Sequence, residues 1–199
     1  MARPKNPAHR AALLAAATRV IAGHGLSAST AMIAKEAGVS AGTLFVYFDT
    51  KTTLINELYV ALKGEMAQVA TAGLRASDAP HDQLRHMWDN WIIWATTDPN
   101  RHRALAQLSV AEDLSGDSHQ AVRAAYAGIA ELLAAITADG PMEVVPLGFI
   151  TALMSAIADT TIDDLIRHPD PGGIRSSTAF GAMWRALTGP SPIETGATS

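Results

Sequence analysis

Apolar residues recur at intervals of three and four along nearly the whole chain, without a sustained alternation of apolar and polar positions. Such spacing places apolar side chains on one face of an α-helix, whereas a β-strand needs a period of two. The pattern therefore predicts an all-α fold of about nine helices with no internal repeat. We expect helices near residues 7–23, 30–37, 41–48, 51–72, 84–95, 99–113, 118–138, 145–167 and 173–188.

Glycine and proline mark several of the expected helix ends. Gly23 and Gly25 should end the first helix, and Asp98 followed by Pro99 is typical of a capped helix start. Gly140 followed by Pro141 predicts a helix end, because neither residue continues a helix well.

Residues 29–51 predict two short helices at a fixed angle. Gly38 stands where a left-handed residue would end the first of them, Val39 can pack inward, and Ser40 can cap the second. The pair can share a small core, which leaves one side of the second helix available to a partner. That core is expected to contain Ile33, Ala34, Ala37, Val39, Leu44 and Phe48.

Charge is distributed unevenly. The chain carries a net charge of −4, but residues 1–51 hold six basic and two acidic side chains, and the remaining residues hold nine basic and seventeen acidic ones. This asymmetry indicates a small cationic module that meets a polyanion, joined to an acidic body. Chance clustering on a solvated surface is the alternative.

The segment from Thr30 to Lys51 is similar to the DNA-binding signature of the TetR family, and the resemblance covers about sixty residues including the first helix. It implies a helix-turn-helix DNA-binding domain over residues 6–66, with the helix-turn-helix at about 29–48. A C-terminal effector-binding and dimerisation domain would cover residues 67–190, before a disordered tail at 191–199. The matching pieces are Ile33-Ala34, Ala37-Gly38-Val39-Ser40, Gly42-Thr43-Leu44-Phe45, Tyr47-Phe48 and Lys51 with Leu54.

The resemblance assigns roles within this segment. It implies phosphate contacts for Thr30, Thr43, Tyr47 and Lys51, and contacts with base edges for Ala41, Gly42 and Phe45; the hydroxyls of Ser29 and Ser40 at the helix starts also suit phosphates. Phe45 stands where many members have tyrosine, and Ala31 and Ala41 offer no hydrogen bonds. We therefore expect specificity from thymine methyls and DNA shape, with Arg3 and Lys5 reaching along the duplex. Packing alone could also explain Phe45 and Tyr47.

Two further sets of residues are expected in the C-terminal domain. Family members commonly enclose a ligand cavity there, and they dimerise through their last two helices. Core packing is the alternative explanation for the tryptophans. On the expected helix at 145–167, a flatter second face carries the small or polar residues Ala152, Ser155, Ala156 and Asp159. The candidate effector pocket contains Met87, Trp88, Trp91, Trp94, His102 and Gln107. The candidate dimer interface contains Ile150, Met154, Ile157, Thr161, Phe180 and Trp184.

Several classes of function are not expected. The chain has no cysteine, which excludes disulfides and thiolate metal sites. We expect no cofactor and no metal, although four possible metal ligands lie close in sequence: Asp78, His81, Asp82 and His86. No phosphate loop, nucleophile elbow or catalytic carboxylate pair is recognisable, so the protein is not expected to be an enzyme. No signal peptide or spanning segment is recognisable, so we expect a cytoplasmic protein with no membrane partner.

Three hypotheses about function follow. The first is a homodimeric repressor on double-stranded operator DNA, released by a small, largely apolar effector through different affinities for two conformations. The second is a regulator of the same fold without a small-molecule effector. The third is a helical carrier or enzyme in which the basic N-terminal module is incidental.

Overall fold

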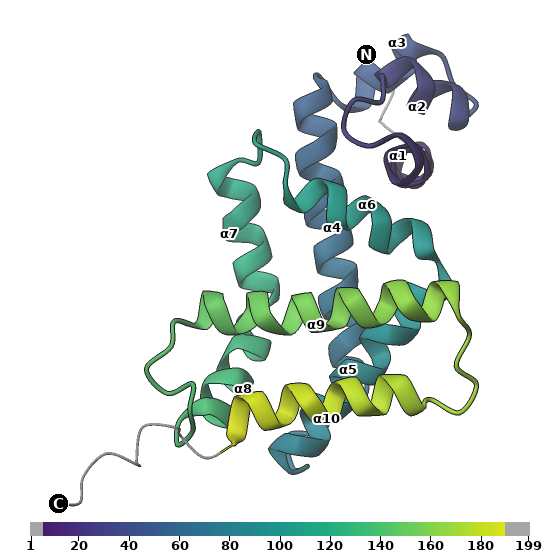
Figure 1. Cartoon of the computed structure of the whole chain (residues 1–199). Helices are drawn as coiled ribbons and strands as arrows, with labels where there is room; N and C mark the ends of the chain where they lie inside the picture. The colour runs from purple at the N-terminus through teal and green to yellow at the C-terminus, as the bar shows by residue number, and fades with distance from the viewer. Residues whose placement is uncertain (1–5, 190–199) are drawn as a thin grey trace, which may run out of the picture. The chain divides into compact units, whose positions relative to one another are not determined.

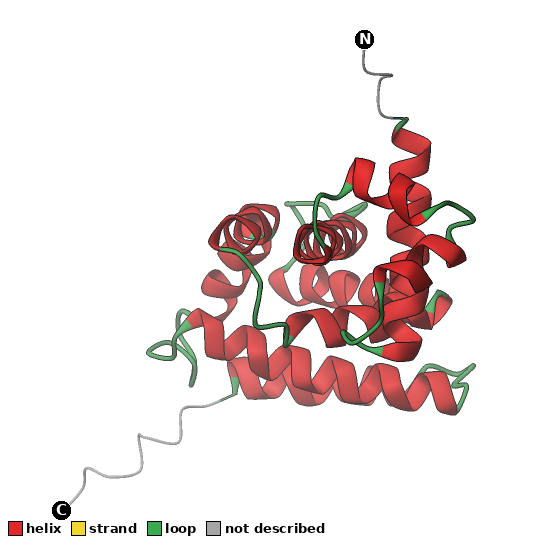
Figure 2. Cartoon of the chain, turned by 90° about the horizontal axis from the view of Figure 1, so that it is seen from above, coloured by secondary structure: helices red, strands yellow, loops and turns green. Residues whose placement is uncertain are grey.

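The computed structural model describes residues 6–189, and within this range every regular element is an α-helix (Figures 1 and 2). The predicted all-α class is therefore confirmed. The ten helices are α1 (Pro7–His24), α2 (Thr30–Glu36), α3 (Ala41–Tyr47), α4 (Lys51–Thr71), α5 (Pro80–Thr97), α6 (Pro99–Ser109), α7 (Gly116–Ala125), α8 (Ala127–Thr137), α9 (Leu147–Arg167) and α10 (Ile174–Thr188).

The helices form two compact units. The first unit contains the described residues up to Met66 together with Asp98–Ala125, and thus α1, α2, α3, most of α4, α6 and α7. The second contains Ala67–Thr97 and the described residues from Tyr126 onward, and thus the end of α4, α5, α8, α9 and α10. Helices α6 and α7 thus belong to the same unit as the N-terminal helices, and the expected domain division after residue 66 stays a prediction.

The first unit is built on a core to which each short helix contributes. Helices α2 and α3 have seven residues each, too few to be stable alone, so their packing must hold them. Ile33 of α2 and Leu44 of α3 are fully buried, and Phe48 closes the same core. The predicted core is confirmed at Ile33, Ala34, Leu44 and Phe48, while Ala37 and Val39 are half-buried.

Trp88 of α5 lies at the centre of the second unit. Its indole Nε1 donates a hydrogen bond to Ser176 Oγ of α10 over 2.9 Å, and its ring lies 6.1 Å from that of Phe180. Ile150, Ala158 and Ile162 bury one side of α9 in this unit. The apolar stripes of α5, α9 and α10 therefore meet in one core.

The structure has one helix more than the nine expected ranges, because the expected helix at 118–138 is two helices. Tyr126 separates α7 from α8 with φ −101° and ψ 5°, outside the helical range, and Gly128 follows, which is unfavourable inside a helix. Apolar spacing continues in phase across this break, so periodicity alone does not detect it.

The helix that begins at Pro99 is shorter than predicted, because it ends at Ser109 and not near residue 113. Its start is as expected, since Asp98 Oδ1 accepts a hydrogen bond from Asn100 N over 3.1 Å. Its end precedes a turn that Asn56 of α4 holds, donating to Asp113 O over 3.0 Å and accepting from Ser115 N over 2.8 Å. These long-range bonds replace further helical ones.

No helix within residues 6–189 combines the length and the apolar character needed to cross a membrane. The predicted tail at 191–199 and the basic residues Arg3 and Lys5 lie outside the described residues.

Candidate nucleic-acid interface

Gly38 sets the angle between α2 and α3. Its φ of +69° is the left-handed conformation that glycine adopts without strain. Gly38 N donates to Lys35 O over 3.0 Å, and Val39 N donates to Ala34 O over 2.9 Å. These bonds satisfy the last carbonyls of α2, so the helix ends here and the chain turns into α3.

Serine side chains cap both short helices. Ser29 Oγ accepts from Met32 N over 3.2 Å, and Ser40 Oγ accepts from Thr43 N over 3.1 Å. Both serines are exposed, and Thr30 and Thr43 are half-buried. The caps fix where each helix begins, and the phosphate contacts expected of these four residues stay predictions.

Helix α3 has a buried side and an exposed side. Leu44 is fully buried, whereas Ala41, Gly42 and Phe45 are exposed, Phe45 to 45%. Val46, which the sequence reasoning did not name, is 56% exposed on the same side. Its position four residues after Gly42 could have placed it there. The exposed side of α3 is thus the side expected to face base edges.

Tyr47 and Lys51 are held by long-range hydrogen bonds. The Tyr47 hydroxyl accepts from Asn6 N over 3.0 Å, and the rings of Tyr47 and His9 meet edge to face at 6.3 Å. Lys51 Nζ donates to Leu26 O over 2.6 Å. These bonds join the end of α3 to the start of α1, and α4 to the turn after α1; the phosphate contacts expected of both side chains stay predictions.

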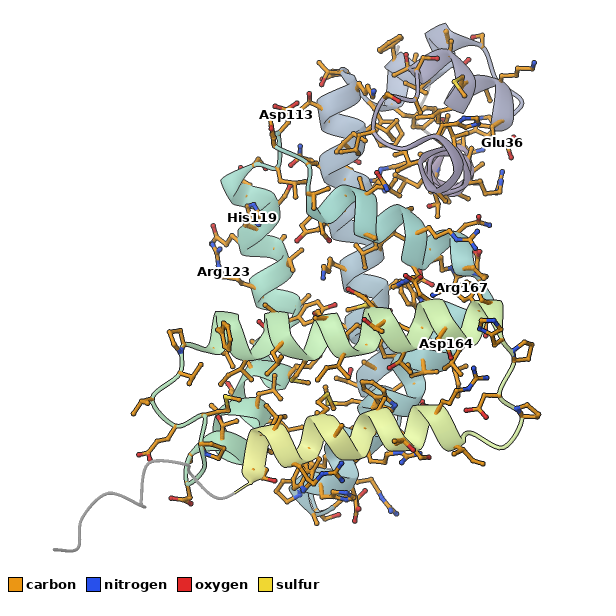
Figure 3. All side chains as sticks on the ribbon, viewed as in Figure 1. Glu36, Asp113, His119, Arg123, Asp164 and Arg167 are labelled. Atoms are coloured by element: carbon orange, nitrogen blue, oxygen red, sulfur yellow. The ribbon has the colours of Figure 1, made fainter. Side chains whose placement is uncertain are left out.

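Two arginines of α1 form ion pairs within the first unit. Arg19 Nε donates to Glu36 Oε1 over 2.6 Å (Glu36 is labelled in Figure 3), and Arg10 pairs with Glu57. Both pairs are partly exposed and contribute little to stability, but they lower the net positive field of these arginines. Lys35 is exposed on α2.

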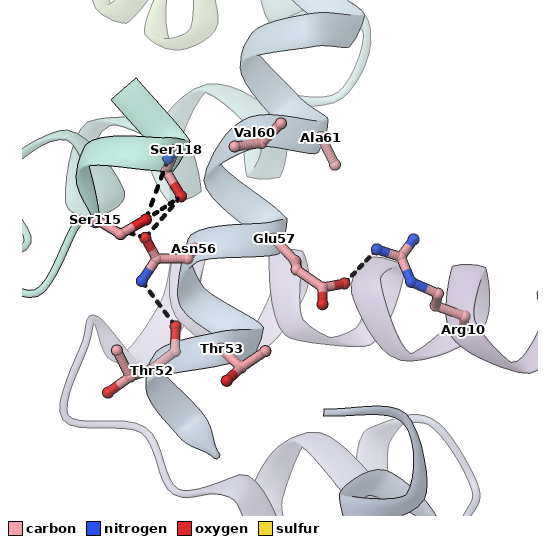
Figure 4. A pocket seen from close by; sticks show the side chains of 9 residues that line it. All are labelled: Arg10, Thr52, Thr53, Asn56, Glu57, Val60, Ala61, Ser115 and Ser118. Atoms are coloured by element: carbon pink, nitrogen blue, oxygen red, sulfur yellow. Dashed lines mark hydrogen bonds and ion pairs between the residues drawn. The ribbon is translucent and has the colours of Figure 1, made fainter. Parts of the chain in front are cut away.

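A groove of about 610 Å³ runs along α4 in the first unit (Figure 4), and sequence reasoning did not find it. Asn56 lies at its centre: besides its bonds to Asp113 and Ser115, it accepts from Ser118 Oγ over 2.7 Å and donates to Thr52 O over 2.9 Å. All four hydrogen-bonding sites of the Asn56 amide are thus used within the chain. The lining residues are Arg10, Thr52, Thr53, Asn56, Glu57, Val60, Ala61, Ser115 and Ser118.

The residues expected in an effector pocket divide between the units. Met87, Trp88, Trp91 and Trp94 lie on α5 in the second unit, and all but the half-buried Trp91 are buried. The remaining two lie on α6 in the first unit, where His102 is buried and Gln107 is exposed. Trp88 packs in the core of the second unit. The four α5 residues thus belong to one unit and the two α6 residues to the other. The pocket stays a prediction.

The residues expected at a dimer interface mostly face the core. Ile150, Met154, Thr161 and Phe180 are buried within the second unit, and Ile157 and Trp184 are half-buried. Buried side chains cannot meet a partner unless the unit opens. The exposed side of α9 instead presents Phe149, at 59%, with Ala152, Ala156 and Asp159.

Among residues 6–189, no group of three or more histidine, aspartate or glutamate side chains is arranged to hold a metal ion. His81 instead packs against aromatic rings, 5.4 Å from Phe180 and 4.8 Å from Trp184.

Comparison with known proteins gives a family match for the N-terminal helices and one related regulator. The model of the family described as bacterial regulatory proteins, tetR family, matches residues 13–58. The chain is 38% identical over 79 residues to the HTH-type transcriptional regulator BetI of Agrobacterium fabrum, a match that spans 39% of this chain and 38% of that relative. The family match covers the two short helices and their caps.

Solved structures match nearly the whole fold. A TetR family transcription regulator from Marinobacter aquaeolei superposes with a TM-score of 0.80 at 20% identity, covering 90% of this chain and 95% of that one. FadR from Bacillus subtilis, solved in complex with stearoyl-CoA, superposes with a TM-score of 0.65 at 16% identity, covering 90% and 98%. These likenesses establish the fold, and the family match shows that residues 13–58 are similar to the N-terminal segment of the tetR family of bacterial regulatory proteins.

Proposed function

We propose that this protein is a transcriptional regulator that binds operator DNA by laying α3 in the major groove. One observation carries the proposal: α3 is anchored by the buried Leu44 while its opposite side, with Ala41, Gly42 and Phe45, is exposed. Small side chains at the start of this helix permit a close approach to base edges. The basic residues of the N-terminal segment supply attraction to phosphates.

The regulator acts as a homodimer, because one seven-residue helix buries too little surface for specific binding. Two copies of α3 about 34 Å apart would address successive major grooves of a pseudo-palindrome. The exposed side of α9, with Phe149, Ala152 and Ala156, supports an interface between copies.

An effector would regulate this binding. The FadR structure that shares the fold contains stearoyl-CoA, a molecule with an apolar acyl chain and a polar coenzyme A group, which supports an effector with an apolar part for this chain as well. We infer that the protein is a cytoplasmic repressor, which the effector releases from the operator by binding the two conformations with different affinity. The packing of Trp88 in the core favours the alternative, a regulator of the same fold that works without such an effector.

Fluorescence anisotropy tests the proposal, with duplexes from around the protein's own gene, a scrambled competitor and two salt concentrations. We expect tight, sequence-selective binding that weakens as salt rises. Gly42→Glu adds a carboxylate to the exposed side of α3, where a new Cβ would meet nothing nearer than Ser40 Oγ at 3.8 Å, and should weaken selective binding by at least about tenfold through repulsion.

The matched control is Gly128→Glu on α8, an exposed position where a new Cβ meets no atom within 4 Å. It changes the net charge equally and should bind like the unmodified protein. Equal loss in both variants, or none in Gly42→Glu, would refute a role for α3 in DNA binding.

A further inference from the structure

Every residue on the exposed side of α3 is either apolar or glycine. Ala41, Gly42, Phe45 and Val46 form a face that spans about 140° of the helix at 100° per residue. Phe45 and Val46 are 45% and 56% exposed, whereas Leu44 on the opposite side is fully buried. A seven-residue helix thus presents two large apolar side chains to solvent next to each other, although packing does not require them there.

The polar side chains of α3 are engaged within the chain. Thr43 Oγ1 lies 2.9 Å from Ser40 Oγ, and the Tyr47 hydroxyl accepts from Asn6 N. Both residues are half-buried and lie outside the exposed face. The face that would meet the base edges therefore offers no side-chain donor or acceptor.

In the major groove, bases differ in hydrogen-bonding groups and in one apolar group, the 5-methyl of thymine. A face without donors or acceptors cannot distinguish the polar patterns, but it gains free energy by covering a methyl group. We propose that Phe45 and Val46 are specificity-determining residues that recognise 5-methyl groups of pyrimidines in the operator. This inference rests on the proposed function and gives the same α3 site its ligand chemistry; 5-methylcytosine presents the same group as thymine.

The test begins with selection of bound duplexes from a random pool by the full-length protein. Each thymine of the selected half-site is then replaced by deoxyuridine, which removes the methyl group and keeps every hydrogen-bonding group. We expect at least one thymine per half-site at which this change weakens binding about four- to tenfold. At that position, 5-methylcytosine paired with guanine should bind more tightly than unmethylated cytosine.

Protein variants assign the effect to residues. Phe45→Ala or Val46→Ala should bring the thymine-to-uracil affinity ratio close to one while salt-sensitive, non-selective binding persists, which also shows that the variant is folded. Val110→Ala is the matched control, because Val110 is 75% exposed but lies outside α3. It should retain the ratio.

The outcomes separate this inference from the function on which it rests. Selection that yields no preferred sequence would overturn both. Selective binding with a ratio of one at every thymine would overturn methyl recognition and leave the regulator proposal standing. A ratio that stays high in both Phe45→Ala and Val46→Ala would show that other residues read the methyl group, which overturns the assignment.

Discussion

The same substitution, glycine to alanine, should have opposite effects at two positions of the first unit. Gly38 has φ +69° in the turn between α2 and α3, whereas Gly64 lies inside α4 with helical neighbours. At both positions an added Cβ meets no atom within 4 Å. Steric overlap is therefore absent in both variants, and the difference between them reports backbone conformation alone.

The magnitudes follow from general propensities. Holding alanine in the left-handed region costs about 1–2 kcal/mol. Alanine also lowers the conformational entropy of the unfolded chain, which offsets about 0.4–1 kcal/mol of this cost. From the midpoints of these ranges, Gly38→Ala should thus lower the free energy of unfolding by about 0.8 kcal/mol. Gly64→Ala should raise it by about 0.5–1 kcal/mol, because alanine is the better helix former.

Thermal unfolding of the full-length variants at one protein concentration would measure both changes, since about 1 kcal/mol corresponds to roughly 2–4 °C in Tm for a chain of this size. Gly38→Asn is a useful third variant, because asparagine tolerates the left-handed region better than alanine does. Shifts of the same sign in Gly38→Ala and Gly64→Ala would refute the reasoning, as would a neutral Gly38→Ala.

Three other measurements test the remaining structural claims. Ser176→Ala should destabilise by about 1–3 kcal/mol in urea unfolding, since it leaves the buried Trp88 N–H without an acceptor. Ser177→Ala removes only the exposed hydrogen bond that Ser177 Oγ accepts from Arg85, so it should change stability little. Asn56→Ala should lower the free energy of unfolding by about 1–2 kcal/mol, and its effect should not add to that of Ser118→Ala in a double-mutant cycle. Additive losses would contradict the hydrogen bond between the two side chains. Desolvation opposes ionisation of Asp164, but the hydrogen bond with His168 and the charge of Arg175 outweigh it and lower the pKa of that carboxyl. The stability it contributes is therefore complete above about pH 4, the unfolded value, and is lost as pH falls through the lower folded pKa; acid unfolding of Asp164→Asn should lack this loss.

Local signals made the N-terminal helices predictable. Ser29, Ser40 and Gly38 each act through neighbours within four residues, so the sequence shows directly where α2 and α3 begin and end. Leu44 and Phe45 were likewise assigned to the buried and exposed sides by helical spacing. The capping of α6 by Asp98 was predictable for the same reason, because its partner Asn100 is two residues away.

Features that depend on distant partners were not predictable. The end of α6 depends on Asn56, which lies 57 residues before the Asp113 carbonyl that it holds. Nothing in the local pattern of residues 109–115 indicates this bond. The grouping of α6 and α7 with the N-terminal helices, and the break at Tyr126 between α7 and α8, depend on tertiary packing in the same way.

The candidate dimer residues show a limit of hydrophobic patterns. The strongest apolar stripe of α9 includes Ile150 and Met154, and the core of the second unit already buries it. A surface that meets another copy must remain soluble before the copies meet, so it can carry only a moderate apolar character. The small residues Ala152 and Ala156 beside Phe149 satisfy that condition. Hydrophobicity alone thus selects the side of a helix that its own unit covers, and the exposed side of α9 that we propose as the interface between copies is the weaker stripe.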